Sequence, residues 1–267
     1  MQDISSLPRL MPIERNQMTT LNGKVAIVTG AAAGFGAAIA SLYVQEGAKV
    51  ILADISVEAG KALAEKLGSA AHFVTCDVSN RAHIDATVNT CIDRFGVPDI
   101  VVNNAGMTHN NQSMLTVEES VFDKMFAVNV KSIFYMAQAV VPHMIKRGKG
   151  VILNVGSTAG IRPRPGLTWY NGSKGAVNLL SKSMAVELGN HGIRVNAICP
   201  VIGETGMLQQ FMGQPDTPEN RAKFIATIPL GRFSRPSDVA AVAHFLATDA
   251  AEFISGVEFP VDGARTV

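Results

Sequence analysis

The stretch KVAIVTGAAAGFGAAIASLYVQEGA, residues 24–48, decides the fold. Its first seven residues are an apolar run of the kind that forms a buried strand. Residues 35–48 have helical spacing and stop at Gly47, a residue suited to a helix C-terminus. Between them, Gly30, Gly34 and Gly36 give the pattern TGxxxGxG. Such a turn serves either a tight backbone bend or a pyrophosphate, which a helix N-terminus attracts through its free N–H groups and dipole.

The same alternation of strand and helix continues along the chain. Further strands are expected at 49–55, 71–78, 99–106, 150–157, 193–200 and 256–263. Ser56 and Ser79 are expected to cap helices, and Thr116 with Glu119 forms a capping box that opens a long helix toward Met144. Another helix opens near Tyr170, and one led by proline starts at Pro236. Apolar strands alternating with helices predict an α/β fold with a doubly wound, Rossmann-type parallel sheet of about seven strands.

The chain reads as one domain at 21–267, preceded by an irregular arm at 1–20, and its segment around 203–228 is rich in turn formers and apolar side chains. Of its 267 residues, 47% are hydrophobic and 17% charged, and the net charge is +1. This balance argues against nucleic acid or an anionic membrane as a partner. No apolar run reaches the roughly 18 residues of a membrane span, and no signal peptide is seen. A cytoplasmic protein is expected.

The three cysteines, Cys76, Cys91 and Cys199, are unclustered. Their spacing argues against a disulfide framework and against a zinc site, so no metal is expected. Buried thiols in a reducing compartment explain them better.

Asp54 ends the second strand at the distance where an acid bonds an adenosine ribose hydroxyl. Asp54 could instead cap a helix, but the glycine turn upstream favours the interpretation that it binds the ribose. A carboxylate at this place repels a 2′-phosphate, and neither Ala33 nor Ile55 offers a positive charge to reverse that. The sequence therefore favours NAD over NADP.

Taken together, the motifs resemble those of the short-chain dehydrogenase/reductase family. TGxxxGxG at 29–36, CDV at 76–78, NNAG at 103–106, Asn129, Ser157 and YxxxK at 170–174 stand in that family's order and spacing, over essentially all of residues 21–267. Two departures are Gly156, where the family often has serine, and PVIGET at 200–205, where the family usually has Pro-Gly followed by a threonine.

The resemblance implies that 21–267 is a dinucleotide-binding catalytic domain with a substrate lid around 203–228. It also implies a catalytic tetrad of Asn129, Ser157, Tyr170 and Lys174. Tyr170 and Lys174 are four residues apart and share one helical face. A phenol ordinarily titrates near about 10, and a cationic neighbour lowers that value, so Lys174 is expected to help Tyr170 act as general base. Ser157 would hydrogen-bond the substrate oxygen, and Asn129 would hold a water that relays protons from Lys174.

The cofactor set that the resemblance and the motifs imply contains the glycine turn, the ends of the neighbouring strands and the loop after residue 200. Its members are Gly30, Ala33, Gly34, Phe35, Gly36, Asp54, Ile55, Asp77, Val78, Asn104, Ala105, Gly106, Tyr170, Lys174, Pro200, Ile202, Gly203 and Thr205.

Substrate contacts are expected from Ser157 and from the segment before Tyr170. Arg162 and Arg164 are each followed by proline, which holds a segment extended, so two guanidinium groups on one side could clamp an anionic substrate. The alternative is a solvated loop. His109 could face substrate or solvent, and Trp169 could line the pocket or only pack.

The leading functional hypothesis is an NAD-dependent dehydrogenase of a secondary alcohol or its ketone. A 3-oxoacyl-thioester reductase is the alternative enzyme, and a dinucleotide-binding regulator without catalysis is the alternative from another class; the complete tetrad argues against the regulator. The helices expected from Thr116 and Tyr170 carry apolar residues on more than one face, which predicts a homotetramer, with a monomer as the alternative.

Overall fold

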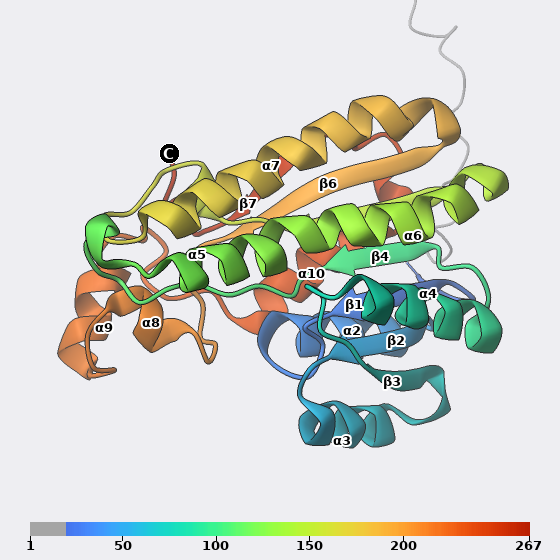
Figure 1. Ribbon diagram of the computed structural model, residues 1–267, viewed down its shortest axis with the longest axis horizontal. Helices are drawn as coiled ribbons and strands as arrows, with labels where there is room; N and C mark the ends of the chain where they lie inside the picture. The colour runs from blue at the N-terminus through green and yellow to red at the C-terminus, as the bar shows by residue number, and fades with distance from the viewer. Residues whose placement is uncertain (1–19) are drawn as a thin grey trace, which may run out of the picture.

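The computed structural model describes residues 20–267, and the predicted arm at 1–20 lies outside them apart from Thr20. Within this part, seven strands form one parallel sheet in the order β3-β2-β1-β4-β5-β6-β7 (Figure 1). The strands are β1 Val25–Thr29, β2 Lys49–Asp54, β3 Ala71–Thr75, β4 Ile100–Asn103, β5 Gly150–Val155, β6 Ile193–Pro200 and β7 Glu258–Val261. The predicted doubly wound parallel sheet is confirmed.

Helices cover both faces of the sheet. They are α2 Gly34–Gln45, α3 Val57–Leu67, α4 Arg81–Phe95, α5 Glu119–Phe126, α6 Ser132–Arg147, α7 Thr168–Leu188, α8 Leu208–Met212, α9 Pro218–Ile225 and α10 Pro236–Ala247. One apolar core lies between the sheet and α2, α3 and α10, and a second lies between the sheet and α4, α6 and α7. The inner strands, such as β1, β4 and β5, are buried on both sides, which explains why their sequences are almost continuously apolar, whereas the edge strands β3 and β7 are partly exposed.

Two predicted helix starts are wrong. Asn80 caps α4, its side chain accepting a hydrogen bond from the Ala82 N–H at 2.9 Å, whereas the Ser79 hydroxyl donates to Asp77. Thr116 ends a short 3-10 turn, and Glu118 precedes α5 without a side-chain cap. Both errors arise because several polar residues precede each helix, and the turn geometry selects which one reaches the first N–H groups. Ser56 does precede α3, but without a side-chain cap hydrogen bond.

The long helix expected toward Met144 is interrupted. Between α5 and α6, residues Ala127–Lys131 form a π-helical turn, which is a common feature of functional sites. Asn129 lies in this turn and is buried. The extra residue per turn rotates Asn129 relative to a regular helix, so the local winding sets where its amide points.

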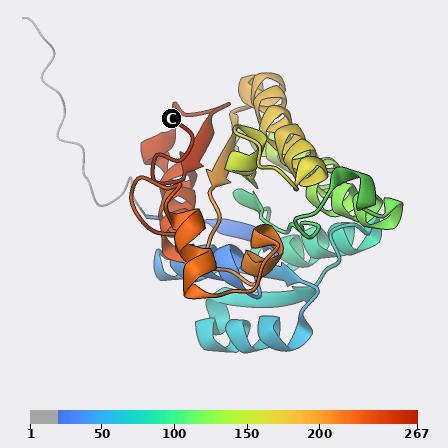
Figure 2. The same ribbon diagram turned by 90° about the vertical axis from the view of Figure 1, so that its left-hand side faces the viewer.

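The order of the strands reverses between β1 and β4, and ligands bind parallel α/β sheets at such a point. Figure 2 looks toward the carboxyl ends of the strands, where α8 and α9 (orange) lie beside the end of the sheet. These helices belong to the segment 203–228, in which a lid is expected. No helix in residues 20–267 is both long and apolar enough to cross a bilayer.

Candidate active site

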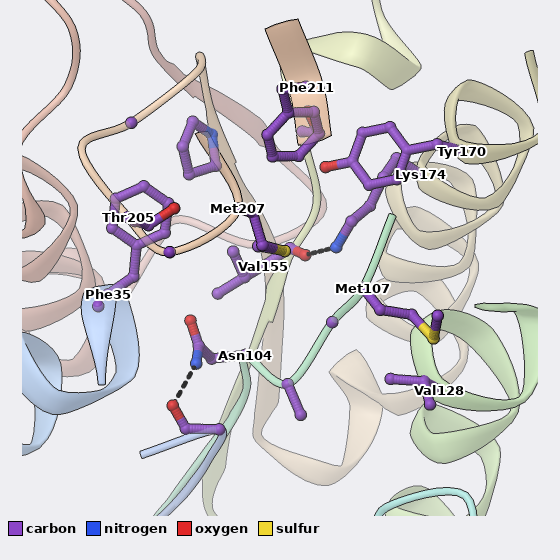
Figure 3. A pocket seen from close by; sticks show the side chains of 18 of the residues that line it. Phe35, Asn104, Met107, Val128, Val155, Tyr170, Lys174, Thr205, Met207 and Phe211 are labelled. Carbon is purple, nitrogen blue, oxygen red and sulfur yellow. Dashed lines mark hydrogen bonds between the residues drawn. The ribbon is translucent and has the colours of Figure 1, made fainter. Parts of the chain in front are cut away.

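A cavity of about 570 Å³ opens at the carboxyl ends of the strands. It runs from the glycine turn and Asp54 at one end to the side chains of α7 and the 203–228 segment at the other. Figure 3 shows Tyr170 and Lys174 pointing into it from α7, with Phe211 beside the tyrosine ring and Asn104 below. One cavity therefore joins the predicted cofactor turn to the predicted catalytic pair.

The glycine turn is shaped by close backbone approaches. Gly30 has φ of +63°, and a Cβ added there would lie 2.9 Å from the Cα of Ala105. Any side chain at Gly36 would collide with the carbonyl oxygen of Gly30. Asn104 locks the arrangement, its Nδ2 donating to the carbonyl oxygens of Thr29 at 2.8 Å and Gly30 at 3.1 Å. The turn thus presents bare backbone to the cavity at the N-terminus of α2, which fits a pyrophosphate.

Asp54 lines the same end of the cavity, held by two backbone donors. Its Oδ2 accepts from the N–H of Ala32 at 2.9 Å and its Oδ1 from the N–H of Ser56 at 2.8 Å. Ala33 and Ile55, which also line this end, carry no charge. A fixed carboxylate among uncharged neighbours suits a ribose diol and opposes a phosphate.

Lys174 is buried near Tyr170, but it does not lower the tyrosine pKa as expected. Its Nζ donates to the carbonyl oxygen of Val155 at 2.8 Å. Burial raises the pKa of Tyr170 to about 12, with the neighbouring Ser157 hydroxyl acting in the opposite direction. Burial also lowers the pKa of Lys174 to about 8. In both groups desolvation outweighs the opposing effect, which comes from the Ser157 hydroxyl for Tyr170 and from Cys199 for Lys174. At neutral pH Tyr170 is therefore a phenol and Lys174 is mostly cationic.

Asn129 lies behind the cavity wall and makes three hydrogen bonds. Its Nδ2 donates to the Met107 carbonyl oxygen at 2.9 Å and to the Ser173 hydroxyl at 3.0 Å, and its Oδ1 accepts from the Met107 N–H at 2.8 Å. A Cβ added to Gly106 would lie 3.4 Å from both Asn129 Oδ1 and Lys174 Nζ. The amide oxygen and the ammonium group therefore flank the same small space.

Ser157 follows β5 and also lines the cavity. Its hydroxyl accepts from the N–H of Ala159 at 3.0 Å, and its carbonyl oxygen accepts from Asn178 Nδ2 at 3.3 Å. The amide of Asn178 occupies the space that a side chain at position 156 would need. This contact gives a physical reason for Gly156, the first departure from the family pattern.

The loop after β6 closes the cavity over the glycine turn. Thr205 Cγ2 would lie 3.5 Å from a Cβ on Gly34, and the Phe35 ring leaves no room for a side chain at Gly203. Pro200, Ile202, Gly203 and Thr205 all line the cavity, despite the altered PVIGET sequence. Of the eighteen predicted cofactor residues, Gly36 is the one that the wall does not include, because it packs beneath Gly30.

Only some of the predicted substrate residues reach the cavity. Ser157 and Arg164 line the cavity, whereas Arg162, Trp169 and His109 do not. Arg162 is exposed and donates to the carbonyl oxygen of Arg265 at 3.1 Å. Trp169 donates to the carbonyl oxygen of Met114 at 3.1 Å and contacts Phe122 edge-on. His109 is buried rather than solvated, with Nδ1 2.7 Å from the carbonyl oxygen of Asn110.

Several apolar wall residues were not foreseen: Met107, Val128, Ala159, Leu167, Met207 and Phe211. Phe211, from α8, packs its ring edge-on against Tyr170 with 5.1 Å between centroids. Apolar residues of this kind carry no motif, and Phe211 reaches the site because α8 packs beside Tyr170. Within residues 20–267 no group of three acidic, histidine or cysteine side chains is arranged to hold a metal.

Comparison with known proteins gives consistent matches. Residues 30–265 match the family model described as enoyl-(acyl carrier protein) reductase. The chain is 50% identical over 259 residues to 4-formylbenzenesulfonate dehydrogenase of Comamonas testosteroni, covering 92% of this chain and 99% of that one. It is 38% identical over 250 residues to a 2-(S)-hydroxypropyl-CoM dehydrogenase of Xanthobacter autotrophicus, and the match covers 92% of this chain and 98% of that one. A 3-ketoacyl-(acyl-carrier-protein) reductase from Brucella melitensis, solved with NADH, superposes with a TM-score of 0.89 at 41% identity. The superposition covers 93% of this chain and 100% of that one.

Proposed function

The chain belongs to the short-chain dehydrogenase/reductase family, and on that premise we propose an NAD-dependent oxidoreductase that interconverts a secondary alcohol and its ketone. One observation carries the proposal: Ser157, Tyr170 and Lys174 lie on the wall of the cavity that also contains Asp54 and the glycine turn. Relatives named as dehydrogenases of hydroxyl compounds and a solved relative containing NADH support it.

Nicotinamide, when bound, supplies hydride transfer at the carbinol carbon. The glycine turn would hold the pyrophosphate, Asp54 the adenosine ribose, and the loop at 200–205 the nicotinamide end. Asp77 and Val78 would border the adenine. Lys174, held by the Val155 carbonyl oxygen, would bind the nicotinamide ribose.

Tyr170 exchanges the proton with the substrate oxygen, while Ser157 hydrogen-bonds that oxygen. In reduction the phenol donates its proton to the developing alkoxide, and in oxidation the phenolate accepts the proton of the alcohol. Asn129, with its amide fixed from three directions, keeps the space beside Lys174 polar enough to hold a water for proton relay. Burial of the tyrosine keeps competing water away from the reacting atoms.

A 3-oxoacyl-thioester reductase is the second candidate. The observation that favours it is the relative named as a 3-ketoacyl-(acyl-carrier-protein) reductase, which was solved with NADH, the cofactor type that Asp54 favours here. Comparing kcat/KM for a 3-oxoacyl thioester with that for a simple ketone decides between the two. We also propose a cytoplasmic homotetramer and, as the relative named for a sulfonated aldehyde suggests, an anionic substituent on the substrate.

The test is turnover of an alcohol panel with NAD, followed through reduced-nicotinamide absorbance. Tyr170→Phe removes only the reacting hydroxyl and is expected to lower kcat at least about a thousandfold, within the range of general acid–base catalysis, while NADH binding stays nearly unchanged. Lys174→Ala is expected to lower both kcat and the affinity for NADH. A Phe variant that keeps a tenth of the activity would exclude Tyr170 as the acid–base group.

A further inference from the structure

The guanidinium of Arg164 has no hydrogen-bond or ion-pair partner in the part of the chain that the structure describes. The side chain lies on the cavity wall and is partly buried, and its Nη2 is fully buried without a hydrogen bond from residues 20–267. The one described contact of its charged group is with an aromatic ring, since Cζ stands 5.6 Å from the centroid of Phe224 on α9. A buried guanidinium N–H is ordinarily hydrogen-bonded, because burying part of a charge without a partner is costly. The absence of a pair at a cavity wall points to a ligand.

The surroundings of Arg164 are electropositive. Burial and the nearby Arg265 lower the pKa of Arg164 to about 10, so the group remains charged at neutral pH. Arg265 also has a buried Nε without a hydrogen-bond partner among the described residues. The acid closest in sequence to it, Asp262, is occupied by the N–H groups of Ala264 and Thr266 and by the Thr266 hydroxyl. Arg265 thus adds a second positive charge near Arg164, and neither guanidinium group forms an ion pair among the described residues.

Arg162 does not share this environment, although the sequence pairs it with Arg164. It is exposed, and its Nη1 donates to the Arg265 carbonyl oxygen at 3.1 Å. The Arg164 backbone is fixed separately, since Asn171 Nδ2 donates to its carbonyl oxygen at 2.8 Å. The predicted pair of parallel guanidinium groups is therefore wrong, and the C-terminal segment supplies the second charge.

We propose that Arg164 binds a sulfonate or carboxylate group of the substrate, with Arg265 adding positive charge behind it. The proposal rests on the proposed function, because the same cavity holds Tyr170 at the reacting end. Met107, Leu167 and Phe211 give the cavity an apolar wall. The substrate class is accordingly a carbonyl or alcohol carried on an apolar body with an oxyanion at its other end. Arginine suits this role because its planar fork binds sulfonate and carboxylate oxygens in pairs.

The experiment compares two ketones of nearly equal size, para-acetylbenzenesulfonate and the neutral para-(methylsulfonyl)acetophenone. Their binding to the protein with NADH is measured by titration calorimetry in wild type, Arg164→Ala, Arg162→Ala and Arg265→Ala. Wild type is expected to bind the sulfonate at least about tenfold more tightly, a difference of about 1.4 kcal/mol. Arg164→Ala is expected to abolish this preference without changing the affinity for the neutral ketone.

Arg162→Ala is the matched control, since it removes the same charge from the same loop, and it is expected to keep the preference. Arg265→Ala is expected to reduce it by a smaller factor than Arg164→Ala. The proposal is overturned if wild type shows no preference, if neither ketone binds, or if Arg162→Ala and Arg164→Ala lose the preference equally. Unchanged NADH affinity in each variant shows that the fold is intact.

Two further readouts separate this proposal from the proposed function. Binding is repeated on Tyr170→Phe, where the preference for the sulfonate must persist although turnover is lost. Reduction of the neutral ketone tests the dehydrogenase activity alone. If the protein binds the sulfonate through Arg164 but reduces neither ketone, the proposed function is wrong and the proposal for Arg164 stands.

Arg164→Met is expected to be at least as heat-stable as wild type, because it replaces a charge without an ion-pair partner by an apolar chain. A clearly lower Tm would show that Arg164 serves the fold.

Discussion

At the scale of single residues, burial governs the acid–base pair. Tyr170 is held as a phenol because its pKa is raised to about 12, and Lys174 loses its charge near its pKa of about 8. The phenol can donate a proton at neutral pH, whereas the phenolate needed to accept one becomes more abundant as the pH rises. The two directions of the reaction should therefore differ in how they respond to pH.

We expect the kcat for alcohol oxidation to rise with pH from about 6 to about 9, because the phenolate fraction grows over that range, and the kcat for ketone reduction to stay nearly constant up to about pH 8, because the phenol stays protonated. Loss of the charge on Lys174 should flatten the rise in oxidation above about pH 8. Steady-state rates in both directions, at saturating substrate and cofactor, provide the measurement. Oxidation that is fastest in acid would contradict the assignment of Tyr170 as the base.

Asp54 should decide which dinucleotide is used. Its carboxylate is fixed by the N–H groups of Ala32 and Ser56, so it cannot turn away from a 2′-phosphate. We expect at least about a tenfold preference for NAD over NADP in kcat/KM, about 1.4 kcal/mol. Asp54→Ala should lose most of it, whereas Glu58→Ala, an exposed acid on α3, should not. Equal use of both cofactors by wild type would show that Asp54 does not face the ribose.

At the scale of elements, α2 and α10 are joined by a hydrogen bond across the first core. The fully buried Tyr43 hydroxyl donates to the carbonyl oxygen of Ala243 at 2.9 Å, and burial raises the pKa of this tyrosine far above its usual value. This contact fixes α10 against the helix that carries the glycine turn. The cofactor turn is thus supported from behind by a helix more than 200 residues away in the sequence.

We expect Tyr43→Phe to lower the free energy of unfolding by about 1 kcal/mol, the usual contribution of one buried hydrogen bond. Denaturant unfolding measures it. Tyr135→Phe serves as the control, because that hydroxyl has no hydrogen-bond partner within the described residues. Equal stability of the two variants would mean that the contact between α2 and α10 is held by apolar packing alone.

At the scale of the whole molecule, α6 and α7 leave apolar side chains uncovered. Phe134 is 53% exposed, Leu179 64% and Val186 87%. They belong to α6 and α7, the two helices that cover the same face of the sheet (Figure 1). An exposed apolar face of this kind is typical of an interface between copies of one chain.

We expect light scattering at micromolar concentration to give the mass of a tetramer, and Leu179→Glu to shift it toward smaller species, because a buried carboxylate without a partner opposes association. Ala59→Glu, on exposed α3 at the other face, should leave the mass unchanged. A wild-type monomer would contradict the proposal.

The sequence by itself determined the sheet, its covering helices and most of the residues that line the cavity beside the glycine turn. These features depend on local patterns: apolar runs, the glycine turn and the i, i+4 spacing of Tyr170 and Lys174. Asp54 and the loop at 200–205 could be placed for the same reason, since the carboxyl ends of parallel strands meet at one edge. Even the altered PVIGET sequence reaches the cavity, because β6 directs it there.

Only the tertiary structure decided where the remaining side chains point. The π-helical turn rotates Asn129, burial raises the pKa of Tyr170, and α8 brings Phe211 onto the tyrosine ring. Arg162 and Arg164 are two residues apart, yet one bonds the C-terminal segment outside and the other enters the cavity. The physical reason is that side-chain direction in a loop, and the desolvation of a charge, depend on segments packed from far along the chain.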